Sequence, residues 1–320
     1  MPEPTAIDVH GHVTSPELLK RFPMPPSLGD VAGMIERKAA LGIGMTIVGS
    51  PVGAGTMVPV PGLDNYRQPV SQLEAFHEWV GELIREHPSH LRGYVYVNPF
   101  GGADELDRAA KRLAQPEFVG LIANTSVQGG YLGSPAADGL FALAHEASSP
   151  ILLHPPAEPV GTAAMNRHLG LIEHVARPCD VTSGVATILF AGWLDKYPGL
   201  KLIAPNAGAA LPLLREKLDL AQQRAAAGPA AGMEPAGTVP ASARLREIYV
   251  DTATPSALGL AAAVEVFGPG HVLFGTDSPP LATPLESALA MVAGLNLADG
   301  DRAGILGGNA RALFGLEEGA

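Results

Sequence analysis

The sequence predicts a (β/α)8 barrel, in which eight parallel strands alternate with eight helices around one axis. Eight short, almost continuously apolar runs alternate with eight longer runs of helical periodicity. The length of 320 residues suits a single barrel domain, expected to span residues 1–320. A doubly wound sheet of six strands is the alternative, but the chain lacks the glycine-rich phosphate-binding motifs typical of that fold.

The predicted strands are hydrophobic along nearly their whole length. Parallel strands that are covered on both faces have this character, because neither face meets water. Short length and flanking turn residues distinguish these runs from buried helices. The strands are predicted at residues 6–10, 45–50, 92–98, 119–124, 150–154, 200–206, 248–253 and 272–277.

The predicted helices start and stop at residues suited to those positions. Asp30 can cap the N-terminus of the first helix, and Gly42 follows its end. Four later helices open at or near a proline, which the first helical turn tolerates. The helices are predicted at residues 30–41, 69–87, 103–114, 135–147, 182–197, 209–227, 255–267 and 284–295.

Three stretches interrupt the repeat. Residues 51–67 and 155–180 follow the second and fifth strands, on the side of a barrel where active sites are built. We therefore expect both to be long loops beside the site. Residues 225–243 are rich in alanine, glycine and proline, which predicts a flexible excursion without chemistry of its own.

Composition narrows the class of protein. Apolar residues make up 47% of the chain, and the net charge of −11 argues against a nucleic-acid partner. Cys179 is the only cysteine, so no internal disulfide can form. Neither a signal peptide nor an apolar run of the ~18 residues that a membrane span needs is visible. We therefore expect a cytoplasmic protein that binds a small molecule.

The strongest local signal is the pair His10 and His12 at the end of the first predicted strand. Alternate side chains of an extended segment share a face, so the two imidazoles project together. Two adjacent imidazoles suit a divalent ion such as zinc. The H-x-H pattern alone leaves a metal site and a chance pair equally open.

Two further residues strengthen the metal hypothesis. His154 and Asp277 end the fifth and eighth predicted strands, and the carboxyl ends of barrel strands meet at one face. Taken singly, His154 could be a core histidine bonded to backbone, and Asp277 could cap the last helix. Together with the first pair they predict a mononuclear site with an open position, for which zinc, manganese, iron or cobalt would serve.

These residues lie within segments that resemble the amidohydrolase superfamily, in the branch of aminocarboxymuconate-semialdehyde decarboxylase and related aromatic-acid decarboxylases. The resemblance implies a barrel fold, the same four residues as metal ligands, and zinc or manganese as the ion. Relatives in this branch are commonly dimers, which implies a homodimer here. The matching segments run through the whole chain, at residues 7–12, 151–155, 197–201, 249–253, 273–277 and 305–311.

One position departs from the family pattern. After the sixth strand the family typically has a histidine that polarises or deprotonates the metal-bound water, and this chain has Asn206. An amide can form hydrogen bonds but cannot take a proton at neutral pH. Either Asp277 carries out the proton transfer alone, or the reaction needs no strong base here, or catalysis has been lost.

Five residues are candidates for contacting substrate. Arg67, in the loop after the second strand, could hold a carboxylate with two hydrogen bonds. Asn124 and Thr125 end the fourth strand, and His168 and His174 lie in the loop after the fifth. For each of them, an ordinary solvated loop position is the alternative.

Three functions are compatible with these residues. The first is non-oxidative decarboxylation of a small aromatic or unsaturated acid, with Asp277 as proton donor and Asn206 orienting the substrate. The second is hydrolysis of an ester, lactone or amide, with Asp277 as base. The third is a catalytically silent barrel that binds a ligand, although a degenerate site would be expected to lose its metal ligands.

Overall fold

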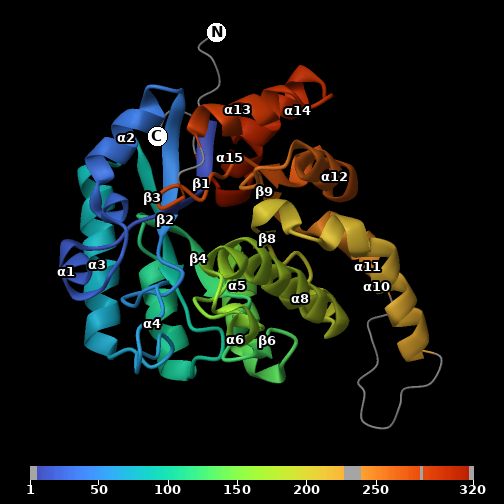
Figure 1. Ribbon diagram of the computed structural model, residues 1–320, viewed down its shortest axis with the longest axis horizontal. Helices are drawn as coiled ribbons and strands as arrows, with labels where there is room; N and C mark the ends of the chain where they lie inside the picture. The colour runs from blue at the N-terminus through green and yellow to red at the C-terminus, as the bar shows by residue number, and fades with distance from the viewer. Residues whose placement is uncertain (1–5, 227–238, 282–283, 317–320) are drawn as a thin grey trace.

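The computed structural model describes residues 6–226, 239–281 and 284–316, and its centre is a parallel sheet of eight strands (Figure 1). The strands follow one another in chain order, and every pairing within this sheet is parallel. The first strand and the segment after the last are joined by a hydrogen bond from Val9 N to Phe274 O at 2.9 Å. The (β/α)8 barrel is thereby confirmed, and the six-stranded alternative is wrong. The strands are β1 (Ala6–His12), β2 (Ile43–Gly49), β3 (Leu91–Tyr96), β4 (Phe118–Asn124), β7 (Ile151–His154), β8 (Leu202–Ala204), β9 (Tyr249–Asp251) and β10 (Val272–Leu273).

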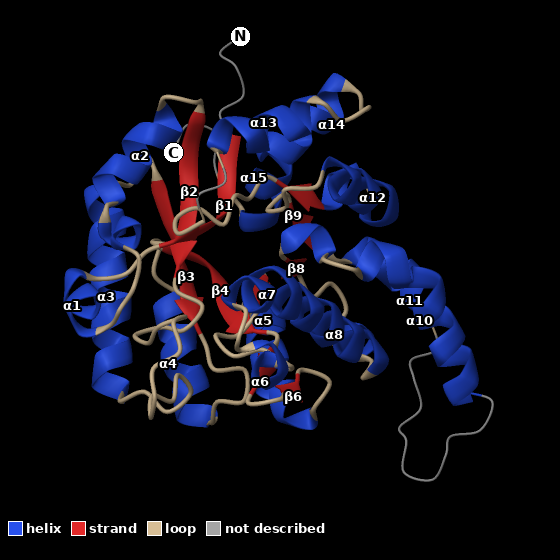
Figure 2. Cartoon of the chain, in the orientation of Figure 1, coloured by secondary structure: helices blue, strands red, loops and turns tan. Residues whose placement is uncertain are grey.

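Helices surround the strands on the outside (Figure 2). Each strand is followed by a major helix, as a right-handed strand–helix–strand crossover requires. The major helices are α2 (Val31–Ala39), α3 (Val70–Glu86), α4 (Ala103–Leu113), α5 (Asp138–Glu146), α8 (Arg177–Phe190), α10 (Leu211–Ala226), α12 (Ala257–Phe267) and α13 (Leu285–Ala293). Shorter helices and one hairpin fill the connections: α1 (Pro16–Arg21), α6 (Thr162–Met165), α7 (Leu169–Leu171), α9 (Trp193–Lys196), α11 (Ala241–Arg244), α14 (Asp299–Ala303), α15 (Asn309–Phe314), and β5 (Ser126–Val127) paired with β6 (Gly130–Tyr131).

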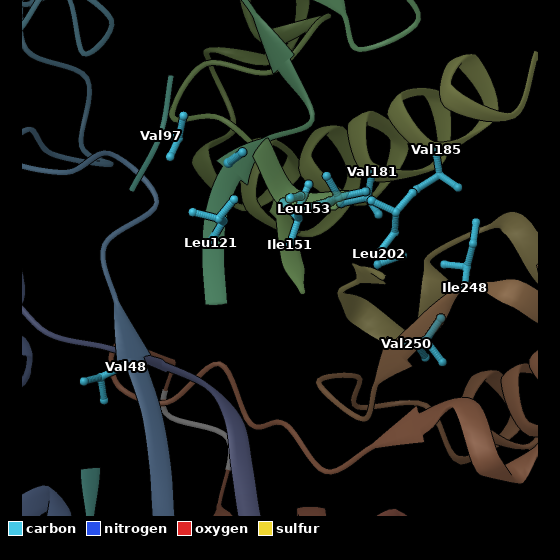
Figure 3. Close-up of a cluster of buried hydrophobic side chains, with 14 of the residues drawn as sticks. Val48, Val97, Leu121, Ile151, Leu153, Val181, Val185, Leu202, Ile248 and Val250 are labelled. Carbon is cyan, nitrogen blue, oxygen red and sulfur yellow. The ribbon is translucent and has the colours of Figure 1, made fainter. Parts of the chain in front are cut away.

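The core has an inner and an outer layer. Along β7, Leu152 packs with the side chains that fill the barrel, whereas Ile151 and Leu153 belong to the outer layer. Figure 3 shows part of that outer layer, where strand residues lie beside Val181 and Val185 of α8. Because both faces of each strand are buried, the strand sequences are apolar throughout rather than alternating.

Five of the eight strands end earlier than the sequence predicts, and the structure gives a local reason for two of them. The predicted strand 272–277 pairs only at Val272 and Leu273. Beyond them Gly275 N donates to the Thr252 hydroxyl at 3.0 Å, which in turn donates to Gly275 O. Hydrogen bonds to the Thr252 side chain therefore take the place of backbone pairing between β9 and the segment after β10. In the other case the chain leaves the sheet after Ala204, because Asn206 adopts a left-handed φ of 57°.

The expectation that residues 155–180 form a loop is partly wrong. Helices α6 and α7 lie within it, and a π-helical turn at Ile172–Ala176 runs directly into α8, which begins at Arg177 rather than near residue 182. Pro178, which has no N–H, follows directly after the π-helical turn, where Arg177 N donates to Ile172 O and the i→i−4 pattern is already interrupted. The predicted helix 182–197 is also interrupted, at Gly192 with φ 72°.

The other two excursions differ from each other. Residues 51–67 contain turns and bends and no helix or strand. Of residues 225–243, the first two belong to α10 and Ala241–Arg244 forms α11, while 227–238 lie outside the described residues. Within the described part of the chain, no helix combines the length and the apolar character needed to cross a bilayer.

Candidate metal centre

The pair His10 and His12 is aimed by an irregularity in β1. Between the pairings Asp8–Thr46 and Gly11–Val48, β1 has one more residue than β2, which is the definition of a β-bulge. Ile7, before the bulge, and Val9, within it, pack in the inner layer of the core. His10 lies within the bulge and His12 after it, and their rings are 5.0 Å apart at the carboxyl end of the barrel. A bulge redirects the side chains that follow it.

Four side chains come together there. The rings of His10 and His12 lie 5.3 and 5.0 Å from that of His154, which ends β7. Asp277 follows β10, and its Oδ1 lies 2.9 Å from His12 Nε2 and 3.5 Å from His10 Nε2. One donor atom from each of the four residues lies within 4.8 Å of the others. This His/Asp group is the arrangement that the sequence predicts.

Each imidazole is oriented by a bond on its other ring nitrogen. Nδ1 of His10 lies 2.6 Å from Asp251 Oδ2, that of His12 lies 3.2 Å from Gly49 O, and that of His154 lies 2.8 Å from Pro155 O. An acceptor at Nδ1 fixes the proton there and leaves Nε2 free as a donor to a metal.

The residues present fit a divalent cation. Nε2 of His10 is buried and has no hydrogen-bond partner among the described residues, although buried polar atoms are normally paired. Three imidazoles and one carboxylate are also the donor set that zinc and manganese accept in mononuclear sites. The group is therefore well suited to bind one such ion.

The four groups shift one another's pKa. Burial alone would lower the pKa of His10, but the carboxylates of Asp277, Asp251 and Asp8 outweigh it and raise the pKa to about 9. Burial would raise the pKa of Asp277, yet the neighbouring imidazoles hold it below its usual range. The pKa of His154 is lowered well below its usual value by burial and by the other two histidines. Without a cation, His10 therefore retains a proton that His154 has lost.

Metal affinity should consequently depend on pH. A cation can bind His10 only after Nε2 has lost its proton, and the pKa of His10 is about 9 in the cation-free protein. The apparent association constant for Mn²⁺ should rise about tenfold per pH unit between pH 6.5 and 8, with about one proton released. Calorimetric titrations in buffers of different ionisation enthalpy measure both quantities. An affinity that is flat over this range would contradict the assignment of His10.

A buried ion pair connects the two segments that carry His10 and Asp277. Lys38 of α2 is 2% exposed, and its Nζ donates to Asp8 Oδ2 at 2.7 Å and to Ser278 O at 2.8 Å. Asp8 Oδ1 accepts from the backbone of His10 and of Thr276, each at 3.0 Å. Asp8 therefore joins β1 to the segment that carries Asp277.

Replacing Lys38, the positively charged member of this pair, should lower the free energy of unfolding. In Lys38→Met, the Asp8 carboxylate would be left buried without its charge partner, and about 3–5 kcal/mol of unfolding free energy should be lost. Urea denaturation measures this loss. Arg37→Met is the matched control, since the neighbouring Arg37–Asp30 pair is more than half exposed and should contribute less than about 1 kcal/mol. Equal losses in the two variants would refute the role of Lys38.

Two cavities meet at the His/Asp group. One of about 180 Å³ is lined largely by apolar side chains such as Val13, Met24 and Val52. The other, of about 530 Å³, extends toward α12. His154 and Asp277 line both cavities, so a ligand in either of them would reach the candidate metal site.

The predicted substrate residues are distributed unequally. Asn206 and His174 line the larger cavity. Asn124 and Thr125 are fully buried beside the end of β7 and line neither cavity. Thr125 Oγ1 donates to the carboxylate of Asp180 at 2.6 Å, which gives it a structural bond.

Arg67 and His168 lie away from the site. The side chain of Arg67 is 85% exposed and lies near Asp64, and His168 is exposed next to α7. Neither is among the residues that line the two cavities. Their positions give no support to a role in binding substrate.

Sequence reasoning missed three residues beside the site. Asp251 could have been found, because it ends β9 as His154 ends β7. Lys38 lies at helical spacing on the buried face of α2 with Val31 and Met34, which is a local signal, although its partner Asp8 is distant in the sequence. Arg177 lines both cavities, but its sequence position appeared to belong to a loop.

Comparison with known proteins agrees with this geometry. A family model described as amidohydrolase matches residues 7–316, so the chain belongs to the amidohydrolase family. Membership in this family is what the sequence predicts.

A curated relative is the 6-methylsalicylic acid decarboxylase of Penicillium expansum, which is 32% identical over 152 residues. The match covers 47% of this chain and 44% of that protein, so it spans less than half of either.

Solved structures share the fold over nearly the whole chain. The 5-carboxyvanillate decarboxylase of Sphingomonas paucimobilis has a TM-score of 0.84 at 18% identity, with 98% of this chain and 100% of that chain covered. A dihydroxybenzoic acid decarboxylase of Polaromonas, solved with manganese and the inhibitor 2-nitroresorcinol, has a TM-score of 0.77 at 21% identity, with 97% of each chain covered.

Proposed function

We propose that this protein is a metal-dependent, non-oxidative decarboxylase of a small aromatic acid. The observation that carries the proposal is the His/Asp group at the junction of two cavities, one of them with mainly apolar walls. An apolar wall suits an aromatic ring, and a metal site at its end suits the carboxylate and an adjacent hydroxyl. The relatives named above act on hydroxylated benzoic acids, which supports this substrate class.

The ion would be held by His10, His12, His154 and Asp277. We propose zinc or manganese, the latter supported by the manganese in the Polaromonas enzyme. When bound, such an ion supplies Lewis-acid polarisation of the substrate's carboxylate and neighbouring oxygen.

Asp277 would carry the proton. Because its pKa lies below the usual range, Asp277 is a carboxylate before substrate arrives and can accept the proton of a phenolic hydroxyl. It would then donate this proton to the ring carbon as the C–C bond to the carboxylate breaks and CO2 leaves. Asn206 would orient the substrate in the larger cavity without exchanging a proton.

A panel of hydroxybenzoates tests the proposal. The Mn²⁺-loaded protein should release CO2 and the corresponding phenol in equal amounts from at least one of salicylate, 6-methylsalicylate and the dihydroxybenzoates. Turnover in ¹⁸O-water should leave the phenol unlabelled, because water oxygen is not consumed. Absence of CO2 from the whole panel would overturn the proposal, and label in the product would favour hydrolysis instead.

Two further proposals concern the protein as a whole. We propose a cytoplasmic location, which the single cysteine supports because reduced thiols are typical of that compartment. We also propose a homodimer, on the family resemblance alone. Gel filtration with light scattering measures the second directly.

A further inference from the structure

An ion pair lies in the wall that the two cavities share. Arg177 opens α8, and Glu173 lies one turn earlier in the π-helical segment, so the two side chains share a helix face. Arg177 Nη1 donates to the Glu173 carboxylate, and Nη2 donates to Met57 O at 3.3 Å in the loop after β2. The side chain of Arg177 is only 12% exposed. The pair is therefore anchored in the wall rather than free in solvent.

This pair supplies most of the charge in the cavities. Among the described residues that line either cavity, the charged side chains other than histidine are Glu173, Arg177 and Asp277. Asp277 belongs to the His/Asp group, whereas Glu173 and Arg177 balance each other. Apart from the metal site, the wall around a ligand therefore presents no net charge.

A neutral wall with a fixed carboxylate discriminates between ligands by charge. The carboxylate that leaves as CO2 would be neutralised by an ion held by His10, His12, His154 and Asp277. A second carboxylate on the ring would compete with Glu173 for Arg177, and like charges brought together in a partly buried wall repel strongly. A hydroxyl or methyl group in the same place meets no such penalty.

We propose that the Arg177–Glu173 pair restricts this site to aromatic acids that carry a single carboxylate. The inference rests on the proposed function, because it takes an aromatic acid as the ligand. In this proposal the Glu173 carboxylate repels a second carboxylate on the ligand. The positive charge of Arg177 neutralises Glu173, so that a ligand with a single carboxylate can still bind.

Nitro compounds test this by binding alone. In 2-nitrophenol the nitro group replaces the leaving carboxylate and cannot depart as CO2, and 4-hydroxy-3-nitrobenzoate adds one carboxylate to the same ring. Absorbance titration of the Mn²⁺-loaded protein gives both dissociation constants, whose ratio measures the discrimination. The wild type should prefer 2-nitrophenol. Glu173→Gln should shift the ratio toward the carboxylated compound by at least about tenfold, because Arg177 is then available to it.

The opposite variant should move the ratio the other way. Arg177→Met leaves Glu173 without its cation, so binding of the carboxylated compound should weaken at least about tenfold further. The double variant, with both charges removed, should fall between the two single variants. Arg85→Met is the matched control, because this arginine pairs with Glu78 and Glu117 on the outside of α3 and should leave the ratio within about threefold.

A wild type that binds both compounds equally, or binds neither, would overturn the proposal. So would a ratio of dissociation constants in Glu173→Gln that differs from the wild type no more than that of Arg85→Met. Equal manganese content and equal melting temperatures in all variants exclude misfolding as the cause of a shift. If no hydroxybenzoate yields CO2 but the ratio still shifts as described, the proposed reaction fails and the assignment of the charge pair stands.

Discussion

The double substitution His10→Ala/His12→Ala should abolish metal binding. Elemental analysis of the purified wild type should find about one divalent ion per chain, and the variant should hold almost none. The reason is geometric: removing both histidines leaves His154 and Asp277, and two ligands cannot hold an ion against water and buffer. The proposed decarboxylation should fall at least about a thousandfold when the ion is lost.

The control is another histidine of the same chain. His145 is exposed on α5, and His145→Ala should retain both metal and turnover. A carefully prepared wild type without metal would contradict the central assignment. So would a double variant that binds metal as the wild type does.

Asp277→Asn should separate the proton-transfer role of this residue from its role as a ligand. Asp277 has a left-handed φ of 53°, a conformation that asparagine tolerates better than most residues, so the backbone should not be strained. The amide oxygen can still face His12, and the three imidazoles remain. The amide cannot carry a proton, so kcat should fall about 10²–10⁴-fold while part of the metal is retained.

Asn206→Ala is the informative comparison for that variant. If Asn206 only orients the substrate, its loss should raise KM and reduce kcat by less than about tenfold. A kcat for Asp277→Asn close to that of the wild type would remove Asp277 from the proton transfer. A loss in Asn206→Ala as large as that in Asp277→Asn would mean that Asn206 takes part in the chemistry.

The fold could be predicted because its signal is local. Strands such as β7 are buried on both faces, and the apolar run that results is visible in the sequence. His10, His12, His154 and Asp277 could be predicted for a related reason, since barrel strands deliver the residues at their carboxyl ends to one place.

Two of the parts that were missed depend on contacts between distant segments, and a third depends on a misleading local pattern. Lys38 is on the buried face of α2 with Val31 and Met34, but that helical spacing does not reveal Asp8 and Ser278 O, the distant groups to which its Nζ donates. The sequence predicts a longer β10 than the structure has, because Gly275 N donates to the Thr252 hydroxyl and not to the backbone of a neighbouring strand. The beginning of α8 was missed because Pro155, Pro156 and Pro159 made the whole stretch look irregular, although a helix can start at Arg177.

Three of the four predicted ligands come from the two ends of the barrel sequence. His10 and His12 stand on β1, whereas Asp277 follows β10, and the seam between these strands is bridged by the Val9–Phe274 bond and by Asp8. A bound ion would therefore cross-link the first and last strands of the barrel. Part of its binding free energy would stabilise the closed barrel, so the holoprotein should resist unfolding from either terminus better than the metal-free chain.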